Sequence, residues 1–237
     1  MKQIINTFIK SSRYYTFIGM PPLMFMEWCI ATSQNPSLQI NDTSHHWSLI
    51  AGCILLNVLA HSMAYCFNSY VDFWTGVDDP KTSVDRTMFD IGMKNLLKII
   101  TFSTVSVILI TVWLVQNSTG EFEWLKSQFI GYTALLIILA ATYTHCKYVA
   151  LGHINCAVYI FATSYFYYQL FTNNVPDRSF YIFSIVANLF FQVPIISNYH
   201  RDLVEDKRAG ILTISILLGE VYSCYLLIAL TFTYVLD

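Results

Sequence analysis

The chain has 237 residues, of which 55% are hydrophobic and only 12% are charged, and its mean hydropathy is +0.50. Because soluble domains carry about 25% charged residues, this composition excludes an ordinary soluble protein and predicts a polytopic membrane protein. The formal net charge of −2 gives no global field that would attract nucleic acid, so we expect no nucleic-acid partner. The six cysteines show neither metal-ligand spacing nor a disulfide framework.

Seven hydrophobic runs approach the roughly 20 residues that a bilayer requires. In chain order they are residues 14–32, 47–67, 95–116, 128–146, 152–171, 180–197 and 212–235. We therefore predict an all-α fold in which about seven transmembrane helices form one polytopic bundle. The bundle is expected to be a single domain over residues 1–237.

The connections between these runs alternate in positive charge. Those assigned to one side carry Lys2, Lys10, Arg13, Lys81, Arg86, Lys94, Lys147, Arg201, Lys207 and Arg208. The connections on the other side carry only Lys126 and Arg178. Because positive charge marks the cytoplasmic side of membrane proteins, the N-terminus and the loops after the second, fourth and sixth runs are predicted to be cytoplasmic.

The second run carries a polar stripe that continues past its end. Its members recur at spacings of four, four, three and four residues: Asn57, His61, Tyr65, Asn68 and Asp72. This spacing places them on one helical face, and such a face is poorly suited to contact with lipid. We expect the stripe to line a cavity with Asp72 at its mouth. Taken alone, His61 is more typical of a hydrogen-bonded core residue than of a catalyst.

Two acidic clusters follow apolar runs. The first comprises Asn68, Asp72, Asp78 and Asp79, and the second comprises Asn198, Asp202, Glu205 and Asp206. In both, an Asn precedes an Asp by four residues, and the two Asn residues are 130 positions apart. This weak repeat predicts a pseudo-symmetric bundle with a site between its halves. A single acidic cluster in a loop is often only solvated, but two matching clusters on one side favour a site.

The clusters predict a magnesium-diphosphate site at the cytoplasmic mouth of an apolar cavity. Four carboxylates would repel one another if left bare, and Mg²⁺ prefers oxygen ligands and bridges them to phosphates. The predicted metal ligands are Asp72, Asp78, Asp202 and Asp206. Nearby cations suit phosphate oxygens, namely Arg86, Lys147, Arg201, Lys207 and Arg208. A ligand that is polar at one end and apolar at the other fits this site in a lipid bilayer, and a prenyl diphosphate has that form.

At these residues the chain resembles the UbiA superfamily of intramembrane prenyltransferases, most of all its 1,4-dihydroxy-2-naphthoate polyprenyltransferase branch. The first aspartate-rich motif of that branch is similar to Asn68-x-x-x-Asp72-x-x-x-Gly76-x-Asp78, with Arg86 downstream. The second resembles Asn198-x-x-Arg201-Asp202-x-x-x-Asp206-x-x-Ala209-Gly210-x-x-Thr213. A short motif between them resembles Tyr143, then Lys147-Tyr148-x-x-Leu151-Gly152.

The resemblance implies a transferase that moves a polyprenyl chain from its diphosphate to an aromatic acceptor with the help of Mg²⁺. By that resemblance, the catalytic residues are Asp72, Asp202 and Tyr143. The diphosphate-binding residues are Asn68, Arg86, Lys147, Arg201 and Asn198. The metal ligands are again Asp72, Asp78, Asp202 and Asp206. The acceptor implied is 1,4-dihydroxy-2-naphthoate, in menaquinone biosynthesis.

The sequence departs from the family pattern at three places, and alternatives stay open. Ser69 and His153 replace an Asp and a Glu that the family usually has. The family typically has nine spans, whereas the run count here is about seven, so the last two helices are expected to be absent or supplied by another chain. Other acceptors are 4-hydroxybenzoate, another phenol, a lipid or haem. A truncated, inactive membrane scaffold is the alternative that involves no catalysis, and a seven-span receptor or channel is a remote one.

Overall fold

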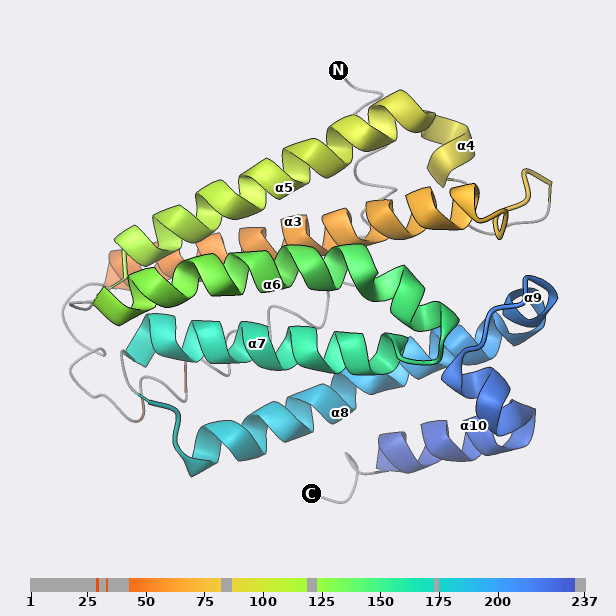
Figure 1. The fold of residues 1–237 in the computed structure, drawn as a ribbon. Coiled ribbons are helices and arrows are strands. Elements are labelled where there is room, and N and C mark those ends of the chain that lie inside the picture. Colours follow the sequence, from red (N-terminus) through yellow and green to blue (C-terminus); the bar gives the residue numbers. More distant parts are fainter. Residues whose placement is uncertain are drawn as a thin grey trace.

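The computed structural model describes residues 29, 33, 43–81, 87–118, 123–172 and 175–232, and every regular element in this part of the chain is a helix (Figure 1). The long helices are α3 (Thr43–Trp74), α5 (Met93–Gln116), α6 (Glu123–Tyr148), α7 (Gly152–Thr172), α8 (Arg178–Arg201) and α10 (Ile214–Phe232). Two short helices, α4 (Thr87–Ile91) and α9 (Leu203–Arg208), lie in the connections. The predicted all-α fold class is confirmed. The first predicted run, 14–32, lies outside the described residues except for Cys29.

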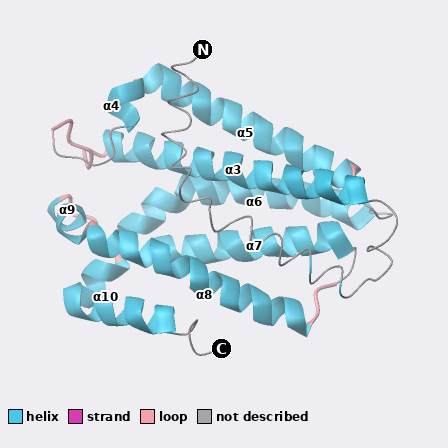
Figure 2. Cartoon of the chain, turned by 180° about the vertical axis from the view of Figure 1, so that it is seen from behind, coloured by secondary structure: helices cyan, strands magenta, loops and turns pink. Residues whose placement is uncertain are grey.

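The long helices pack side by side in the order α5, α3, α6, α7, α8 and α10, as the front and back views agree (Figures 1 and 2). Helix α3 therefore lies between α5 and α6, although α5 is the next long helix after it in the chain. The C-terminal ends of α3, α6 and α8 lie at one end of this bundle, together with α4 and α9. Both predicted acidic clusters are thus at the same end of the molecule.

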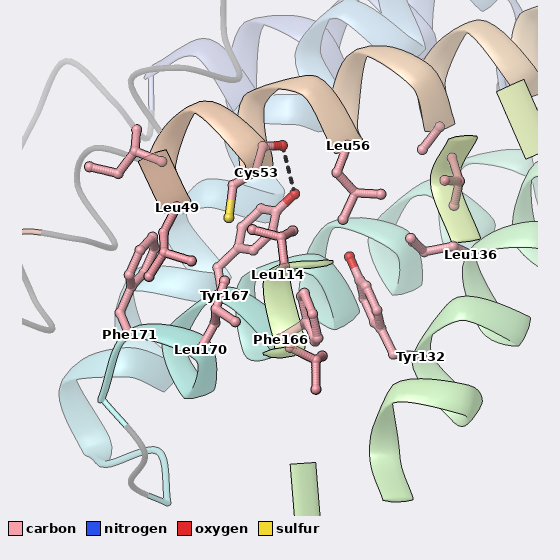
Figure 3. Packing of buried hydrophobic residues seen from close by; sticks show 14 of the residues in the cluster. Leu49, Cys53, Leu56, Leu114, Tyr132, Leu136, Phe166, Tyr167, Leu170 and Phe171 are labelled. Carbon is pink, nitrogen blue, oxygen red and sulfur yellow. Dashed lines mark hydrogen bonds between the residues drawn. The ribbon is translucent and has the colours of Figure 1, made fainter. Parts of the chain in front are cut away.

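The largest buried cluster joins α3, α5, α6 and α7 (Figure 3). Leu49, Leu56, Leu114 and Leu136 are each 1% exposed or less. Helices α3 and α5 approach closely at Gly52, where an added Cβ would lie 2.6 Å from Cζ3 of Trp113. Because protein interiors are packed at crystal-like density, this core fixes how the helices that carry the site lie against one another.

The polar stripe of α3 faces the interior of the bundle, as predicted, and its deep end bonds to α7. The amide of Asn57 donates to the hydroxyl of Tyr167 at 2.7 Å and accepts from the hydroxyl of Tyr159 at 3.1 Å. Tyr167 in turn donates to the carbonyl of Cys53 at 3.1 Å (Figure 3). Hydroxyl groups from α7 thus bond the deep end of the stripe directly. That the stripe lines a cavity with Asp72 at its mouth stays a prediction.

Five described helical segments are long and apolar enough to cross a membrane: Trp47–Trp74, Met93–Gln116, Gln128–Tyr148, Arg178–Arg201 and Ile214–Phe232. They correspond to five of the seven predicted runs. Helix α7 also extends along the bundle but is less apolar, because it carries several tyrosines along with His153, Asn155 and Gln169. It lies between α6 and α8, and its Asn155 and Gln169 are buried.

The last predicted run, 212–235, is not one straight helix. The backbone at Gly219 has φ 77° and ψ 169°, a conformation that interrupts the helical path inside α10. Glycine adopts positive φ without the steric cost that a side chain would bring, so this residue permits the bend. The described part of α10 beyond Gly219 packs along α8.

Candidate functional site

The first acidic cluster is held by the C-terminal cap of α3. Gly76 has φ 73°, its N–H donates to the carbonyl of Phe73, and the N–H of Val77 donates to the carbonyl of Asp72. These are the two bonds of a Schellman motif with glycine in the left-handed position. The N–H of Asp78 also donates to the Asp72 carbonyl at 3.2 Å. The cap therefore brings Asp72 and Asp78 to one turn.

The second acidic cluster uses the same cap. Asp202 lies between α8 and α9, and Asp206 lies inside α9. Gly210 has φ 74°, its N–H donates to the carbonyl of Lys207, and the N–H of Ile211 donates to the carbonyl of Asp206. Both caps thus have the form Asp-x-x-x-Gly. They align Asp72 with Asp206, four residues later than the register that the Asn spacing predicted.

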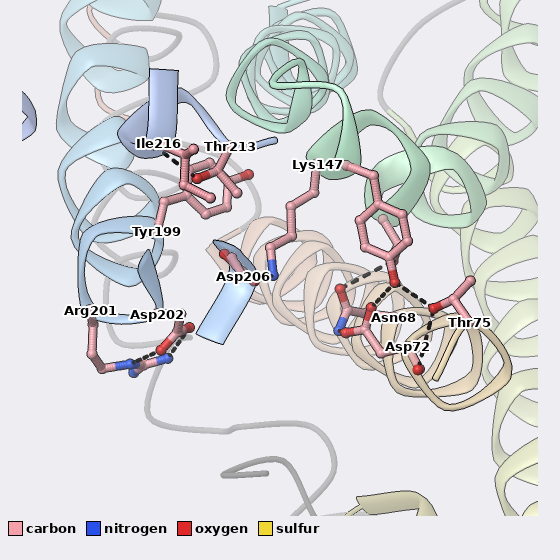
Figure 4. Close-up of polar contacts among 12 residues, drawn as sticks. Asn68, Asp72, Thr75, Lys147, Tyr199, Arg201, Asp202, Asp206, Thr213 and Ile216 are labelled. Atoms are coloured by element: carbon pink, nitrogen blue, oxygen red, sulfur yellow. Dashed lines mark hydrogen bonds and ion pairs between the residues drawn. The ribbon is translucent and has the colours of Figure 1, made fainter. Parts of the chain in front are cut away.

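The C-terminal end of α6 connects the two clusters through adjacent residues (Figure 4). The ammonium group of Lys147 forms an ion pair with Oδ1 of Asp206 at 2.9 Å. The hydroxyl of Tyr148 donates to Oδ1 of Asp72, and the amide of Asn68 donates to Oδ2 of the same carboxylate at 2.6 Å. One dipeptide therefore contacts a carboxylate from each acidic cluster.

Three further contacts hold the end of α6, two to α3 and its cap and one to α8. The hydroxyl of Thr144 donates to Oδ1 of Asn68 at 3.1 Å, and that of Tyr148 lies 2.9 Å from Oγ1 of Thr75. On the neighbouring face, the hydroxyl groups of Tyr143 and Tyr199 are 3.1 Å apart. The pairs Thr144/Tyr148 and Tyr143/Lys147 each have a spacing of four, so α6 presents one pair to α3 and the next to α8 and α9.

The turn between α6 and α7 lies against the segment that follows the second cluster. The N–H of Leu212 donates to the carbonyl of Tyr148 at 3.1 Å, in an isolated parallel bridge. At Gly152 an added Cβ would lie 2.3 Å from the hydroxyl of Tyr199 and 3.0 Å from Cα of Lys147. A side chain at position 152 would collide with both groups. Glycine therefore lets the turn pack tightly against Tyr199 and the backbone of Lys147.

Asp206 is the most enclosed carboxylate of the second cluster. It is 3% exposed, and its Oδ2 accepts no hydrogen bond from any described residue. Burial raises the pKa of this carboxyl, and the Lys147 ammonium lowers it and so offsets part of that effect. The buried oxygen therefore has lone pairs available for a cation.

The adjacent residues Arg201 and Asp202 form a two-pronged ion pair, called the fork below. The Arg201 guanidinium donates to both carboxylate oxygens of Asp202 at 2.6 and 2.7 Å (Figure 4). Beside them is a pocket of about 410 Å³ lined by residues of the first cap and of the second cluster and its cap: Gly76, Val77, Arg201, Val204, Glu205, Arg208 and Ala209. The guanidinium of an exposed arginine suits oxyanions such as phosphate, so the fork is a candidate anion contact.

The structure brings most of the predicted site residues to this end of the bundle. Asn68, Asp72, Lys147 and Asp206 are joined by the bonds described above. Asn198 accepts the N–H of Asp202 with its backbone carbonyl at 3.0 Å, but its side chain makes no hydrogen bond with the described residues. Arg86 lies outside the described residues.

Four contacting residues were assigned no role from the sequence: Thr75, Thr144, Tyr148 and Tyr199. Thr144 and Tyr148 could have been predicted from the sequence, because they repeat the four-residue spacing of Tyr143 and Lys147 one position along α6. Tyr199 carries none, since the chain has 33 Phe and Tyr residues (17 and 16) that a single sequence does not distinguish.

The predicted function implies a magnesium ion at this site. Within the described ranges, no three His, Cys, Asp or Glu side chains converge closely enough to hold an ion. The chemistry of the donors nevertheless suits Mg²⁺, which prefers carboxylate oxygen. Asp206 presents a buried oxygen without a donor, and Asp72 and Asp202 hold donors that a cation can replace.

The site combines carboxylates from two helix caps with a lysine between them, and apolar helices lie behind it. This is a membrane protein with a polar site at one end. Residues 20–236 match the UbiA prenyltransferase family, and the chain belongs to that family. Together with its apolar helices, this makes it a multi-pass integral membrane protein.

Several curated proteins named UbiA prenyltransferase domain-containing protein 1 are similar to the chain. The rat protein is 28% identical over 190 residues, which cover 78% of this chain and 54% of the relative. The human protein is 27% identical over the same length, with coverages of 78% and 54%. The Dictyostelium discoideum protein is 27% identical, with coverages of 76% and 55%. The chain thus spans about half the length of the curated relatives it matches. They support the superfamily that the motifs indicate, but not the predicted naphthoate branch.

Proposed function

We propose that this protein transfers a prenyl chain from a prenyl diphosphate to a hydroxylated aromatic acceptor and releases diphosphate. The observation that carries the proposal is the contact of Lys147 and Tyr148 with carboxylates of both acidic clusters. Two segments more than 120 residues apart in the chain are thereby joined at the end of an apolar bundle. Membership of the UbiA prenyltransferase family supports the same reaction class.

The charged residues of the site divide into carboxylates, which suit Mg²⁺, and cations, which suit the oxygens of the diphosphate. Asp72, Asp78, Asp202 and Asp206 are the proposed ligands of Mg²⁺, which would supply charge to stabilise the departing diphosphate. Lys147 neutralises Asp206 in the substrate-free protein, and its ammonium is placed to turn toward a diphosphate oxygen. Arg201 can exchange the Asp202 carboxylate for a phosphate, because both ligands fit the guanidinium fork.

The apolar half of the donor requires a hydrophobic environment close to these charges. Tyr143 lies one helical turn before Lys147 on α6 and meets Tyr199 of α8. We propose that Tyr143 lines the place where the allylic carbon reacts, because the face of an aromatic ring attracts developing positive charge. Asn68 and Asn198 are proposed to support the diphosphate end from α3 and α8, and Arg86 is proposed to contact it too.

The acceptor end is less defined by the residues present. His153, at the start of α7, has a buried Nδ1 that makes no hydrogen bond with the described residues. Gln192 of α8 donates to the His153 carbonyl at 3.2 Å and has a buried, unbonded Oε1 in the same part of the structure. These atoms suit hydroxyl groups of an aromatic acceptor. We propose 1,4-dihydroxy-2-naphthoate as the first acceptor to test, and menaquinone biosynthesis as the corresponding role.

The test uses membranes that contain the full chain, a labelled polyprenyl diphosphate, Mg²⁺ and a panel of acceptors: 1,4-dihydroxy-2-naphthoate, 4-hydroxybenzoate, another phenol, a lipid and haem. Mass spectrometry should detect one prenylated product, and chelation of Mg²⁺ should abolish it. Asp72→Ala and Asp202→Ala should each lower the rate at least about a hundredfold, because each removes a charged group from the site.

Asp90→Ala is the matched control, because Asp90 is an exposed carboxylate of α4 at the same end of the bundle but outside both clusters. It should transfer prenyl groups at the wild-type rate. The proposal fails if no acceptor is prenylated, or if Asp72→Ala and Asp202→Ala behave like the control. An inactive scaffold would give the first of these results.

A further inference from the structure

A line of polar side chains runs along the contact between α7 and α8, which lie side by side in opposite directions (Figure 1). Ser184, Asn188 and Gln192 of α8 recur at spacings of four residues and so share one helical face. The side-chain oxygen of each is buried and makes no hydrogen bond within the part of the chain that the structure describes. Because a buried oxygen without a hydrogen-bond donor is unfavourable, three in one line are unusual.

This line faces α7. The amide of Gln192 donates to the carbonyl of His153, at the start of α7, at 3.2 Å. Phe191 of α8 lies in one buried cluster with Ile160 of α7. Asn188 lies between Phe191 and Gln192 around the axis of α8, so its side chain also faces α7. The contact between the two helices is therefore apolar on one side of Asn188 and polar on the other.

The hydrogen bonds of Asn188 and Gln192 fix the orientation of both amides. The amide nitrogen of Asn188 donates to the carbonyl of Ser184 at 3.0 Å, as that of Gln192 donates to the carbonyl of His153. A carbonyl oxygen carries no proton, so only the NH₂ side of each amide can face it. Oδ1 of Asn188 and Oε1 of Gln192 are therefore the atoms left without a partner, and both can only accept. A ligand that satisfies them must donate two hydrogen bonds.

The spacing of the two amides suits one aromatic ring. Asn188 and Gln192 are one helical turn apart, a rise of ~6 Å. The hydroxyl groups of a 1,4-dihydroxyarene lie on opposite sides of a ring and span a similar distance. An arene with a single hydroxyl group can satisfy only one of the two oxygens. The pair therefore suits a flat apolar ring with a hydrogen-bond donor on each side.

The amide of Gln192 lies next to the tyrosine pair at which the allylic carbon is proposed to react. His153, which accepts from Gln192, directly follows Gly152, where an added Cβ would collide with the hydroxyl of Tyr199. That hydroxyl is 3.1 Å from the hydroxyl of Tyr143. A ring bound to Gln192 would thus lie beside the apolar half of the prenyl donor.

We propose that Asn188 and Gln192 select the prenyl acceptor by requiring an aromatic ring with two hydroxyl groups in para positions. Each hydroxyl group donates to one of the two amide oxygens. A ring that lacks one of these donors is rejected, because one oxygen then stays buried without a partner. The inference rests on the proposed prenyl transfer and adds the residues that distinguish one acceptor from another.

The experiment measures binding to the full chain in phosphatidylcholine nanodiscs, without turnover. The probes are 1,4-dihydroxynaphthalene, 1-naphthol and naphthalene, which differ only in the number of hydroxyl groups. Equilibrium dialysis under argon, against nanodiscs without protein, corrects for partition into lipid. Wild type should bind 1,4-dihydroxynaphthalene about tenfold more tightly than 1-naphthol, because each hydroxyl group satisfies one buried oxygen.

Two variants test the residues themselves. Asn188→Leu and Gln192→Leu should each weaken binding of 1,4-dihydroxynaphthalene about tenfold and leave that of naphthalene unchanged, because each removes one hydrogen-bond acceptor at similar volume. Thermal unfolding should show that both variants remain folded. Asn117→Leu is the matched control, because the Asn117 amide also donates to a carbonyl four residues earlier but lies at the end of α5. It should bind all three probes like wild type.

Kinetics separate selection of the acceptor from a general packing defect. With a labelled prenyl diphosphate, Gln192→Leu should raise KM for the prenyl acceptor about tenfold and leave KM for the diphosphate unchanged. The inference is overturned if wild type binds the three probes equally well, or if both leucine variants keep the wild-type preference. Probes that bind in the expected order without any prenylated product would support this inference and contradict the proposed prenyl transfer.

Discussion

At the scale of single residues, Lys147 and Tyr148 show how neighbours in a helix can serve two different partners. Successive positions of an α-helix point about 100° apart, so adjacent side chains reach different helices. Lys147 reaches Asp206 of α9, and Tyr148 reaches Asp72 of α3. Each contact holds one acidic carboxylate in a fixed orientation. The pair therefore fixes the separation of the two clusters before any ligand binds.

Tyr148→Phe tests whether this orientation matters for activity. The change removes one charge-assisted donor from Asp72, a bond type worth about 1.5–3 kcal/mol. We expect kcat/KM for the prenyl diphosphate to fall about tenfold to a hundredfold, and the Mg²⁺ concentration for half-maximal rate to rise. Steady-state kinetics over a range of Mg²⁺ concentrations measures both effects.

Tyr167→Phe is the control for loss of a buried tyrosine hydroxyl. It breaks bonds to Asn57 and to the Cys53 carbonyl in the core, remote from the acidic clusters. It should lower thermal stability without moving the Mg²⁺ dependence. If Tyr148→Phe shifts stability alone, in the same way as this control, then Tyr148 only supports packing.

The residues of the clusters could be predicted because charge is rare in this chain and therefore informative. Asn68, Asp72, Lys147 and Asp206 were all named from the sequence, and all take part in bonds that join the clusters. Which cation pairs with which carboxylate could not be predicted from the sequence. Nothing in the spacing indicates that Lys147 selects Asp206 rather than Asp202, since that depends on the cap that ends α9 at Gly210.

At the scale of elements, the turn from α6 to α7 determines where the end of α6 lies. Ala150 has φ 60°, which is uncommon for a residue with a side chain. The turn is also bonded to the segment after α9 through Leu212. Strain of this kind persists only where the surrounding structure enforces it, and here the enforced element carries Lys147 and Tyr148.

Gly152→Ala should disturb this turn. The added methyl would meet the hydroxyl of Tyr199 and the backbone of Lys147, and overpacking of this kind costs about 1–3 kcal/mol. We expect a lower unfolding temperature and a loss of transferase activity larger than the loss of folded protein explains. Thermal unfolding in detergent, combined with activity per folded molecule, separates the two effects.

Gly131→Ala provides the comparison, since no atom lies within 4 Å of a Cβ added at that position of α6. It should be neutral or slightly stabilising, because alanine favours helix over glycine. Equal behaviour of the two variants would show that the turn tolerates a side chain and does not fix Lys147.

The element boundaries show what hydrophobic patterning can and cannot predict. Runs at 95–116 and 180–197 match α5 and α8 within a few residues, because lipid-facing helices are apolar on most of their surface. Helix α7 matches its run in position but is less apolar, since its polar side chains bond to α3 and α6. The bend at Gly219 follows from local backbone conformation, which hydropathy does not register.

At the scale of the whole molecule, the proposed site depends on three helices ending on the same side of the membrane. Helices α3, α6 and α8 end together (Figure 1), and the intervening α5 and α7 run in the opposite direction. Lys and Arg are concentrated in the loops at this end, which we propose is cytoplasmic. The charged substrate would then enter from the compartment that holds soluble diphosphates.

Single cysteines, introduced after the six native ones are replaced, test this orientation. Thr75 lies within the first cluster, Ala209 directly follows the second, and both are exposed, whereas Val175 is 82% exposed between α7 and α8 at the other end. A membrane-impermeant maleimide should label Thr75→Cys and Ala209→Cys only in inverted vesicles, and Val175→Cys only in right-side-out vesicles. Labelling of Thr75→Cys and Ala209→Cys from opposite sides would place the two clusters on different membrane faces. Their carboxylates would then be unable to share one diphosphate, and prenyl transfer by this site would be excluded.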